Sequence, residues 1–258
     1  MAATLFLKSD QLRYLLMTSS FHWVLLALAA LAASTLAAVT GFGGAAVLLP
    51  ALVAAFGVRD AIPILTVAQL IGNGSRVWFN RKELDWKVVG WFAVGAVPLA
   101  YAGGVLFAKA PLGALTRALG AFLLLVVVWR HARPRNPRRF PVQTFAGIGA
   151  GASFLSALLG SVGPIMAPFF LAYGLFKGAY IGTEALSTVV MHVVKLFAYH
   201  ETAVLTRLGV LAGLALGPIM VLGSFLGKRI VDKLPEKVFV LVIEAVLVAA
   251  GVVFLVKG

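Results

Sequence analysis

The chain has 258 residues, of which 61% are hydrophobic, and it carries a formal net charge of +13 with no cysteine. Ordinary globular domains are roughly half apolar, so we expect an integral membrane protein. The absence of cysteine excludes disulfides, thiolate metal sites and thiol chemistry. The positive charge lies in short connections between apolar runs, which argues against nucleic-acid binding and for a role in membrane topology.

Ten apolar segments follow one another, most of them close to the roughly 20 residues that a helix needs to cross a bilayer. Their expected bounds are 21–39, 45–58, 61–79, 88–107, 112–129, 144–159, 164–176, 179–197, 205–227 and 238–256. Segment 21–39 is predicted to be a retained helix rather than a signal peptide, because another apolar segment follows at once. At about 1.5 Å per residue, segments 45–58 and 164–176 reach roughly 20 Å, less than the bilayer core of roughly 30 Å. Each is expected to be a half-helix or the returning arm of a re-entrant hairpin.

A short linker rich in arginine and proline divides the chain into similar halves. It predicts a first membrane repeat at 1–130, a basic linker at 131–141 and a second repeat at 142–258. A shift of 119 residues aligns Gly41 with Gly160, Gly44 with Gly163, Asn73 with His192, Arg76 with Lys195, Gly90 with Gly209, and Gly104 with Gly223. Each half holds a broken helix pair and three spans, and so makes an odd number of crossings. We therefore predict an all-α polytopic fold of eight to ten transmembrane segments, built from two inverted-topology repeats.

The distribution of lysine and arginine predicts the orientation in the membrane. With this threading, thirteen basic residues gather on the side of the central linker and seven on the other side. Basic residues favour the cytoplasmic side of a membrane protein. We therefore expect the linker in the cytoplasm and both termini outside.

Two helix breaks, TGFGGAAVLLP at 40–50 and LLGSVGPIMAP at 158–168, place irregular backbone at membrane depth. Such backbone is tolerated where it is buried in protein or lines a cavity. Each break precedes a helix N-terminus, and open N–H groups at such an end bind anions. The glycines could instead serve only close helix packing. Because the break recurs at equivalent positions, we favour a small-anion site with backbone contacts at Gly41, Gly43, Gly44, Gly160 and Gly163.

Two apolar segments carry polar side chains at spacings of three and four, which place these side chains along one helix face. The third segment has Thr66, Gln69, Asn73, Arg76 and Asn80, and the eighth has Glu184, Ser187, Thr188, His192 and Lys195. Ionisable groups within a span cost at least ~2.5 kcal/mol and normally face a cavity or a partner. We expect Arg76 and Lys195, with Asn73 and His192, to complete a positive pocket. The alternative is that both cations extend to the membrane interface.

Three ionisable side chains are candidates for carrying a coupling proton. Glu184 and His192 lie eight residues apart on one predicted helix face, and Glu244 is alone in the last apolar segment. Carboxyl and imidazole groups both exchange protons. The structural alternatives are a counter-ion role for Glu244 and a polar group near its helix start for Glu184. No metal site and no cofactor are expected.

Four motifs stand in order along the two halves: the GFGG break followed by a proline, RKELDWKVVG at 81–90, the GSVGP break followed by a proline, and GTEALSTVVMHVVKLFAY at 182–199. Together they resemble the sulfite exporter TauE/SafE family of membrane permeases over nearly the whole chain. The first family motif usually has a third consecutive glycine where this chain has Ala45. The resemblance implies transport of small sulfur-containing anions, such as sulfite and organosulfonates, across the bacterial plasma membrane.

The expected function is therefore that of a secondary transporter, an exporter of small sulfur-containing anions that works by alternating access. The alternative is a passive small-anion channel, or a permease for another oxyanion. An enzyme is not expected, because no HExxH motif occurs and the four aspartates lie in predicted loops or tails. The expected partners are a small anion and the lipid bilayer, with a homo-oligomer as a further option and no nucleic acid. The expected location is the bacterial inner membrane, as a multi-pass protein.

Overall fold

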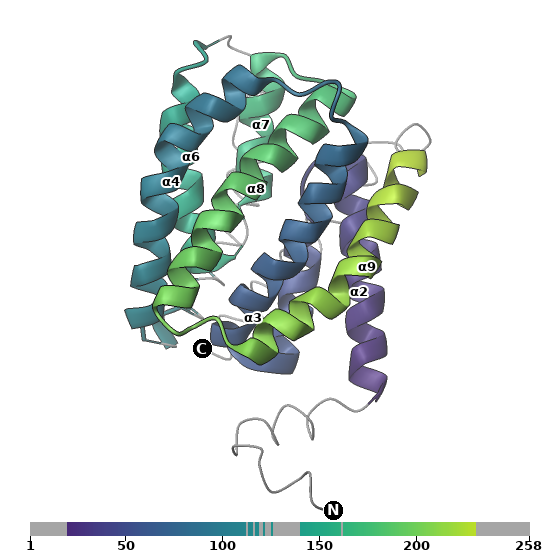
Figure 1. The fold of residues 1–258 in the computed structure, drawn as a ribbon, viewed down its shortest axis with the longest axis vertical. Coiled ribbons are helices and arrows are strands. Elements are labelled where there is room, and N and C mark those ends of the chain that lie inside the picture. Colours follow the sequence, from purple (N-terminus) through teal and green to yellow (C-terminus); the bar gives the residue numbers. More distant parts are fainter. Residues whose placement is uncertain are drawn as a thin grey trace, which may run out of the picture.

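The computed structural model describes residues 20–111, 113–115, 117–118, 121, 125, 140–160 and 162–230, and regular structure there is helical (Figure 1). The helices are α2 (Ser20–Thr40), α3 (Gly44–Phe79), α4 (Trp86–Lys109), α6 (Thr144–Leu159), α7 (Gly163–Tyr173), α8 (Lys177–Glu201) and α9 (Arg207–Ile230). Helices α2, α3, α4, α8 and α9 are long and apolar enough to cross a membrane. The all-α polytopic class is confirmed. Segment 238–256, with Glu244, lies outside the described residues, as do most of segment 112–129 and of the linker.

The outer surface of this bundle is apolar. Val24, Leu28, Val94 and Leu211 each leave about half or more of their area exposed, at 55%, 58%, 63% and 51%. Large exposed apolar patches on a water-soluble protein are rare and mark an interaction surface. On helices of this length they form the surface that faces lipid.

Helix α3 contains two of the expected segments, 45–58 and 61–79. Its helical backbone is interrupted at Gly57, where φ is 76° and ψ is 165°. A left-handed φ favours glycine, because glycine has no Cβ to clash with the backbone. The short segment expected at 164–176 is α7, which has 11 residues and ends before Gly174 at φ 108°. Both halves therefore pass from a short helix to a long one through a residue in an unusual conformation.

The helices follow the same order in both halves. In the first half, α2 is followed by a break at 41–43, the short first part of α3, its long second part, and α4. In the second half, α6 is followed by a break with Gly160 and Val162 at its two sides, and then by α7, α8 and α9. Gly44 and Gly163, which the 119-residue shift aligns, each begin the helix after the break.

The short helices fold back against the helices that precede them, forming two hairpins. The rings of Trp23 in α2 and Phe56 in α3 lie 6.3 Å apart, centroid to centroid. In the second half, Tyr173 at the end of α7 lies 5.4 Å from the ring of Phe145 near the start of α6. The tips of the two hairpins meet, because a Cβ on Gly163 would lie only 3.1 Å from the Cβ of Phe42. The irregular backbone of both halves is thus gathered in the interior.

Helices of one half pack against helices of the other in equivalent pairs. Helix α4 packs against α6 and α8, and α9 packs against α2 and α3. Glycine allows the close approach: a Cβ on Gly95 of α4 would overlap the carbonyl of Ala146, and one on Gly223 of α9 would overlap the hydroxyl of Ser34. Small residues have this role where membrane helices cross closely. At Gly95 and Gly223, the packing explanation for glycine therefore holds.

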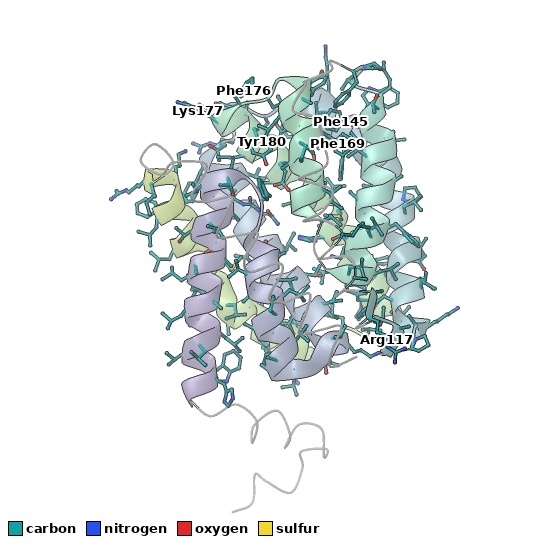
Figure 2. All side chains as sticks on the ribbon, turned by 180° about the vertical axis from the view of Figure 1, so that it is seen from behind. Arg117, Phe145, Phe169, Phe176, Lys177 and Tyr180 are labelled. Atoms are coloured by element: carbon teal, nitrogen blue, oxygen red, sulfur yellow. The ribbon has the colours of Figure 1, made fainter. Side chains whose placement is uncertain are left out.

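The hairpins begin at different ends of the bundle. The first begins at the end where Arg59 donates to the carbonyls of Ala108 and Ala110, at 2.9 and 2.7 Å. The second begins at the end that holds Phe140, Lys177 and the start of α4, which we call the linker end. In Figure 2, Lys177 lies at the linker end of the bundle and Arg117 lies at the opposite end.

Candidate functional site

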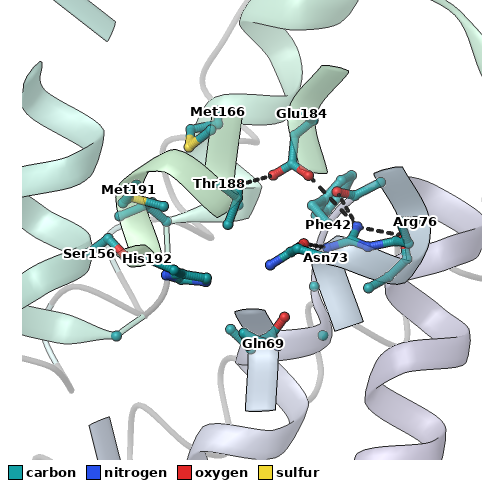
Figure 3. A pocket seen from close by; sticks show the side chains of 18 residues that line it. Phe42, Gln69, Asn73, Arg76, Ser156, Met166, Glu184, Thr188, Met191 and His192 are labelled. Carbon is teal, nitrogen blue, oxygen red and sulfur yellow. Dashed lines mark hydrogen bonds and ion pairs between the residues drawn. The ribbon is translucent and has the colours of Figure 1, made fainter. Parts of the chain in front are cut away.

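A cavity of about 40 Å³ lies where the two hairpin tips meet (Figure 3). A water molecule needs roughly 10–15 Å³ of such space, so a few waters or one small oxyanion would fit. The five glycines expected at the site all line it, as do the expected side chains of Asn73, Arg76 and His192. The fold therefore brings together, from both halves, all but one of the residues predicted to bind the anion.

Two helix starts contribute backbone to this cavity. Helix α3 begins after Gly43, whose φ of 93° needs glycine, and α7 begins after Val162 with a proline in its first turn. Within the described chain neither start is capped by a side chain. The first N–H groups of a helix have no partner within the helix, and they carry the positive end of its dipole. Gly44, Ala45 and Gly163 bring both ends to the cavity wall.

Arg76 is the cation at the cavity wall, and it is held from several directions. Its Nη1 donates to the carbonyl oxygens of Ala37 and Gly41, both at 3.1 Å, and its Nη2 donates to Asn73 Oδ1. Its Nη1 also lies 3.7 Å from a carboxylate oxygen of Glu184. The side chain is buried by protein, although Arg76 lies in the last turn of α3. Arg76 thus ties the second part of α3 to α2, to the first break and to α8.

Lys195 occupies the equivalent position in the second half but does not line the cavity. It is fully buried, and its Nζ donates to Ser156 Oγ at 3.0 Å. Ser156 itself does line the cavity. The positive charge of Lys195 is therefore one side chain away from the space, with the Ser156 hydroxyl between them.

Four buried polar atoms on the cavity wall have no hydrogen-bond partner within the described part of the chain: Glu184 Oε2, which faces Arg76, and the nitrogens Gln69 Nε2, Asn73 Nδ2 and His192 Nδ1. We call the three nitrogens the cavity donors, the histidine nitrogen being a donor when it carries the proton. Because Asn73 Oδ1 accepts from Arg76, its amide nitrogen is the atom left for the cavity. Buried polar groups are nearly always hydrogen-bonded. A ligand rich in acceptor oxygens would satisfy all three.

Glu184 is the carboxylate of the site. One of its oxygens accepts from Thr188 Oγ1 at 3.2 Å, and the other faces Arg76. Glu184 and His192, the two coupling candidates within the described chain, therefore share one cavity. Formal charges of Arg76, Lys195 and Glu184 leave the region at +1, which favours an anion over a cation. No group of three His, Asp or Glu side chains that could hold a metal ion occurs among the residues described.

Sequence reasoning missed some residues that line the cavity. It placed others on the polar helix face without assigning them to the site. Gln69 lies on the polar stripe of α3, but the stripe alone does not say which of its members face the cavity. The 119-residue shift aligns Ser156 with Ala37, but the sequence does not show that Arg76 donates to the carbonyl of Ala37, so the repeat alone does not single out Ser156. Phe42, Met166 and Met191 form apolar walls, and nothing in the sequence distinguishes them from core residues.

Comparison with known proteins finds one family. The family model of the sulfite exporter TauE/SafE matches residues 26–254, nearly the whole chain. The match covers both breaks and both polar stripes. The comparisons with curated proteins and with solved structures found no match.

Proposed function

The chain belongs to the sulfite exporter TauE/SafE family, a family of membrane transporters and not of enzymes, and we propose that it is a secondary transporter that exports small sulfur-containing anions, such as sulfite or organosulfonates. One observation carries the proposal: the cavity donors, two helix starts and Arg76 converge on one small space. Oxyanions such as sulfite offer several acceptor oxygens and a negative charge in a compact volume. Buried charge and hydrogen-bond donors of this kind suit that ligand.

In this proposal, anion oxygens accept from Gln69 Nε2, Asn73 Nδ2 and His192, and from the N–H groups at the starts of α3 and α7. Arg76 supplies charge directly. Lys195 supplies charge through Ser156, whose hydroxyl accepts from the ammonium group and can turn its own proton toward the anion. Gly41, Gly43, Gly44, Gly160 and Gly163 let the backbone approach the ligand closely.

The transport mechanism that we assign is alternating access between two inverted repeats. It is supported by the equal helix order in the two halves, by the exchanged packing of α4 with α6 and α9 with α2, and by hairpins that begin at different ends. In such transporters, discontinuous helices form the substrate site near the bilayer midplane, at the interface of the repeats. The proposed arrangement has eight to ten membrane segments, with the linker in the cytoplasm of a bacterial cell and both termini outside.

The two ends of the pathway differ in a way that fits one state of such a cycle. At the linker end, Asn80 lines a second cavity that also reaches Arg76. The 119-residue shift aligns Asn80 with Tyr199, which is fully buried, donates to the carbonyl of Ala157 at 2.5 Å and packs on the ring of Phe107 at 5.4 Å. We interpret Tyr199 as the closure of the opposite end, so that the described state faces the linker.

Binding is tested first by thermal unfolding of the detergent-purified protein with sulfite, sulfoacetate, taurine, sulfate, thiosulfate, phosphate and chloride. A ligand that binds only the folded state raises the unfolding temperature. We expect a shift with sulfite or a sulfonate, lost in Asn73→Leu, which removes a cavity donor without removing much volume. Thr66→Val is the matched control, because Thr66 lies on the same stripe but donates to the carbonyl of Ile62. No shift with any anion, or an equal shift in Asn73→Leu, would contradict the site.

Transport is separated from passive conduction by counterflow in proteoliposomes. Proteoliposomes that contain a transporter and are loaded with unlabelled anion accumulate labelled anion transiently above its external concentration, because the two fluxes share one site. A channel only dissipates the gradient. Counterflow supports the secondary transporter, and simple equilibration supports the alternative of a passive small-anion channel.

We assign proton coupling to Glu184 and His192, whose carboxylate and imidazole share the cavity. If Glu184 or His192 carries the proton, uptake into vesicles responds to an imposed pH gradient, and Glu184→Gln or His192→Gln removes the response while counterflow persists. A gradient response that survives both substitutions would exclude these two groups and move attention to Glu244, which the structure does not describe.

A further inference from the structure

A second cavity, of about 160 Å³, lies at the linker end between the end of α3, the start of α8 and the end of α9. Its polar lining residues are Arg76, Asn80, Glu83, Lys177, Ser224 and Lys228. It is larger than the central cavity and lies between that cavity and the linker end of the bundle. We call it the outer cavity.

Arg76 lines both cavities. Its side chain is held on Ala37, Gly41 and Glu184 by hydrogen bonds and an ion pair. An anion in the outer cavity would meet the guanidinium group from the linker side, whereas an anion in the central cavity would meet it from the hairpin tips.

Two lysines from different helices converge on the outer cavity. Lys228, in the last turn of α9, is held at the rim because its Nζ donates to the carbonyl of Phe79. Lys177 begins α8 with φ at 47°, a left-handed conformation that residues with a Cβ rarely adopt. An unusual conformation kept by a non-glycine residue is a reason to look for a function. A glycine at position 177 would adopt this φ without strain. The chain has a lysine there instead, and its ammonium group lies beside the cavity.

Glu83 is the opposing charge, since its carboxylate lies against Gly178 at the same cavity. Arg76 is paired with Glu184, so the two lysines against the one carboxylate of Glu83 leave the outer cavity formally positive. Other cations at this end have different surroundings: Arg81 lies over the ring of Trp78 and Arg229 over the ring of Phe225, both at 4.4 Å. The preference of basic residues for the cytoplasmic side would by itself place cations at this end, but it does not require two of them to line one cavity.

We propose that the outer cavity is a second anion site, in which Lys177 and Lys228 bind a small oxyanion before it reaches Arg76. The ligand class is that of the central site, a sulfonate or an inorganic sulfur oxyanion, and this assignment of ligand rests on the proposed function. A positive cavity with low-dielectric walls concentrates anions at its mouth and raises their rate of association. For an exporter facing the linker, this is the side from which the substrate comes.

The site is tested through a cysteine placed in it, since the natural chain has none. Ser224→Cys puts a thiol on the wall with almost no change in volume, and Ile181→Cys supplies a second reporter. Each protein is treated with two methanethiosulfonates, one bearing a sulfonate and one a trimethylammonium group. We expect the anionic reagent to react faster, and the ratio of rates to fall by about tenfold or more in Lys177→Ala/Lys228→Ala, because two nearby charges act with opposite sign on the two reagents.

The matched control removes two cations from the same end, Arg81→Ala/Arg229→Ala, and we expect the ratio to change by less than about twofold, since exposed distant charges are screened. Glu83→Gln should change the ratio in the opposite direction and favour the sulfonate reagent further. Sulfoacetate should protect the thiol in the parent protein and not in the lysine double variant. An equal fall in both double variants, or a thiol that neither reagent reaches in either reporter, would overturn the proposal.

Transport measurements separate this inference from the proposed function. In vesicles where the linker end faces the substrate, the lysine double variant should show a raised KM with kcat within about twofold of the parent, because exposed lysines supply capture and not the central binding step. If the parent transports none of the anions, the proposed function fails, and the labelling ratios still decide whether the outer cavity binds anions. If the parent transports and the KM and labelling of the double variant are unchanged, the second site fails alone.

Discussion

Arg76 and Lys195 reach back to equivalent positions in the two halves of the protein. Arg76 Nη1 donates to the carbonyl of Ala37 at 3.1 Å, and Lys195 Nζ donates to the hydroxyl of Ser156 at 3.0 Å. The 119-residue shift that aligns the two cations also aligns Ala37 with Ser156. Each cation therefore joins the long helix after a break to the helix before it, α3 to α2 and α8 to α6. In addition, Arg76 is paired with Glu184, and the shift aligns Glu184 with Leu65, so the two halves differ in charge.

Removing Arg76 alone should damage folding, because it leaves the Glu184 carboxylate buried and unpaired. Breaking one partner of a buried ion pair costs about 3–5 kcal/mol. We expect Arg76→Met to lower the unfolding temperature strongly and Arg76→Met/Glu184→Leu to recover most of the loss. The anion-dependent shift should be absent from both proteins. Recovery of the shift in the double variant would mean that Arg76 holds the fold and does not bind the anion.

Ser156→Ala should weaken both the fold and the binding of the anion. The substitution removes the acceptor of a buried ammonium group, for which about 1.5–3 kcal/mol is expected. It also removes the hydroxyl that we place between Lys195 and the anion. Affinity for the anion, measured by thermal unfolding at increasing concentration, should fall at least tenfold. Ser153→Ala is the control, since Ser153 is also buried in α6 but is not a lining residue of the cavity in the described chain; an equal loss there would assign the effect to packing.

Gly41→Ala should be poorly tolerated, for two reasons that act together. The φ of Gly41 is 78°, and left-handed backbone costs a residue with a Cβ about 1–2 kcal/mol. The added Cβ would also overlap the ring of Tyr180. Gly74→Ala in α3 meets open space and should be neutral or stabilise by up to about 1 kcal/mol. Unfolding temperatures of the two variants check this difference, and similar values would mean that the first break rearranges at little cost.

Tyr199→Ala should make the protein leak anions. Truncation of a large buried aromatic side chain leaves a cavity and costs about 3–5 kcal/mol, here at the end that we interpret as closed. Tyr199→Phe keeps the ring on Phe107 and loses only the hydrogen bond to Ala157, for about 1 kcal/mol. Anion efflux from vesicles without a counter-substrate should rise in the alanine variant and stay near the parent rate in the phenylalanine variant. An alanine variant as tight as the parent would remove Tyr199 from the pathway.

Local features of the sequence determined the membrane class, the two breaks and the faces that carry polar side chains. Apolar length sets the spans, glycine and proline set the interruptions, and spacings of three and four set the helix face, and each of these acts within a few residues. The repeat went further, because it predicted that Gly44 and Gly163 have the same role in their halves, and both begin a helix at the break.

Only the tertiary structure decided which stripe residues reach the cavity and how the charges are paired. Gln69 and Asn73 face the space while Lys195 stands behind Ser156, and Glu184 of one half meets Arg76 of the other. These relations join positions tens to more than a hundred residues apart. They depend on how the two hairpins meet and on how closely glycine lets the helices approach. Periodicity along a single helix carries no information about either.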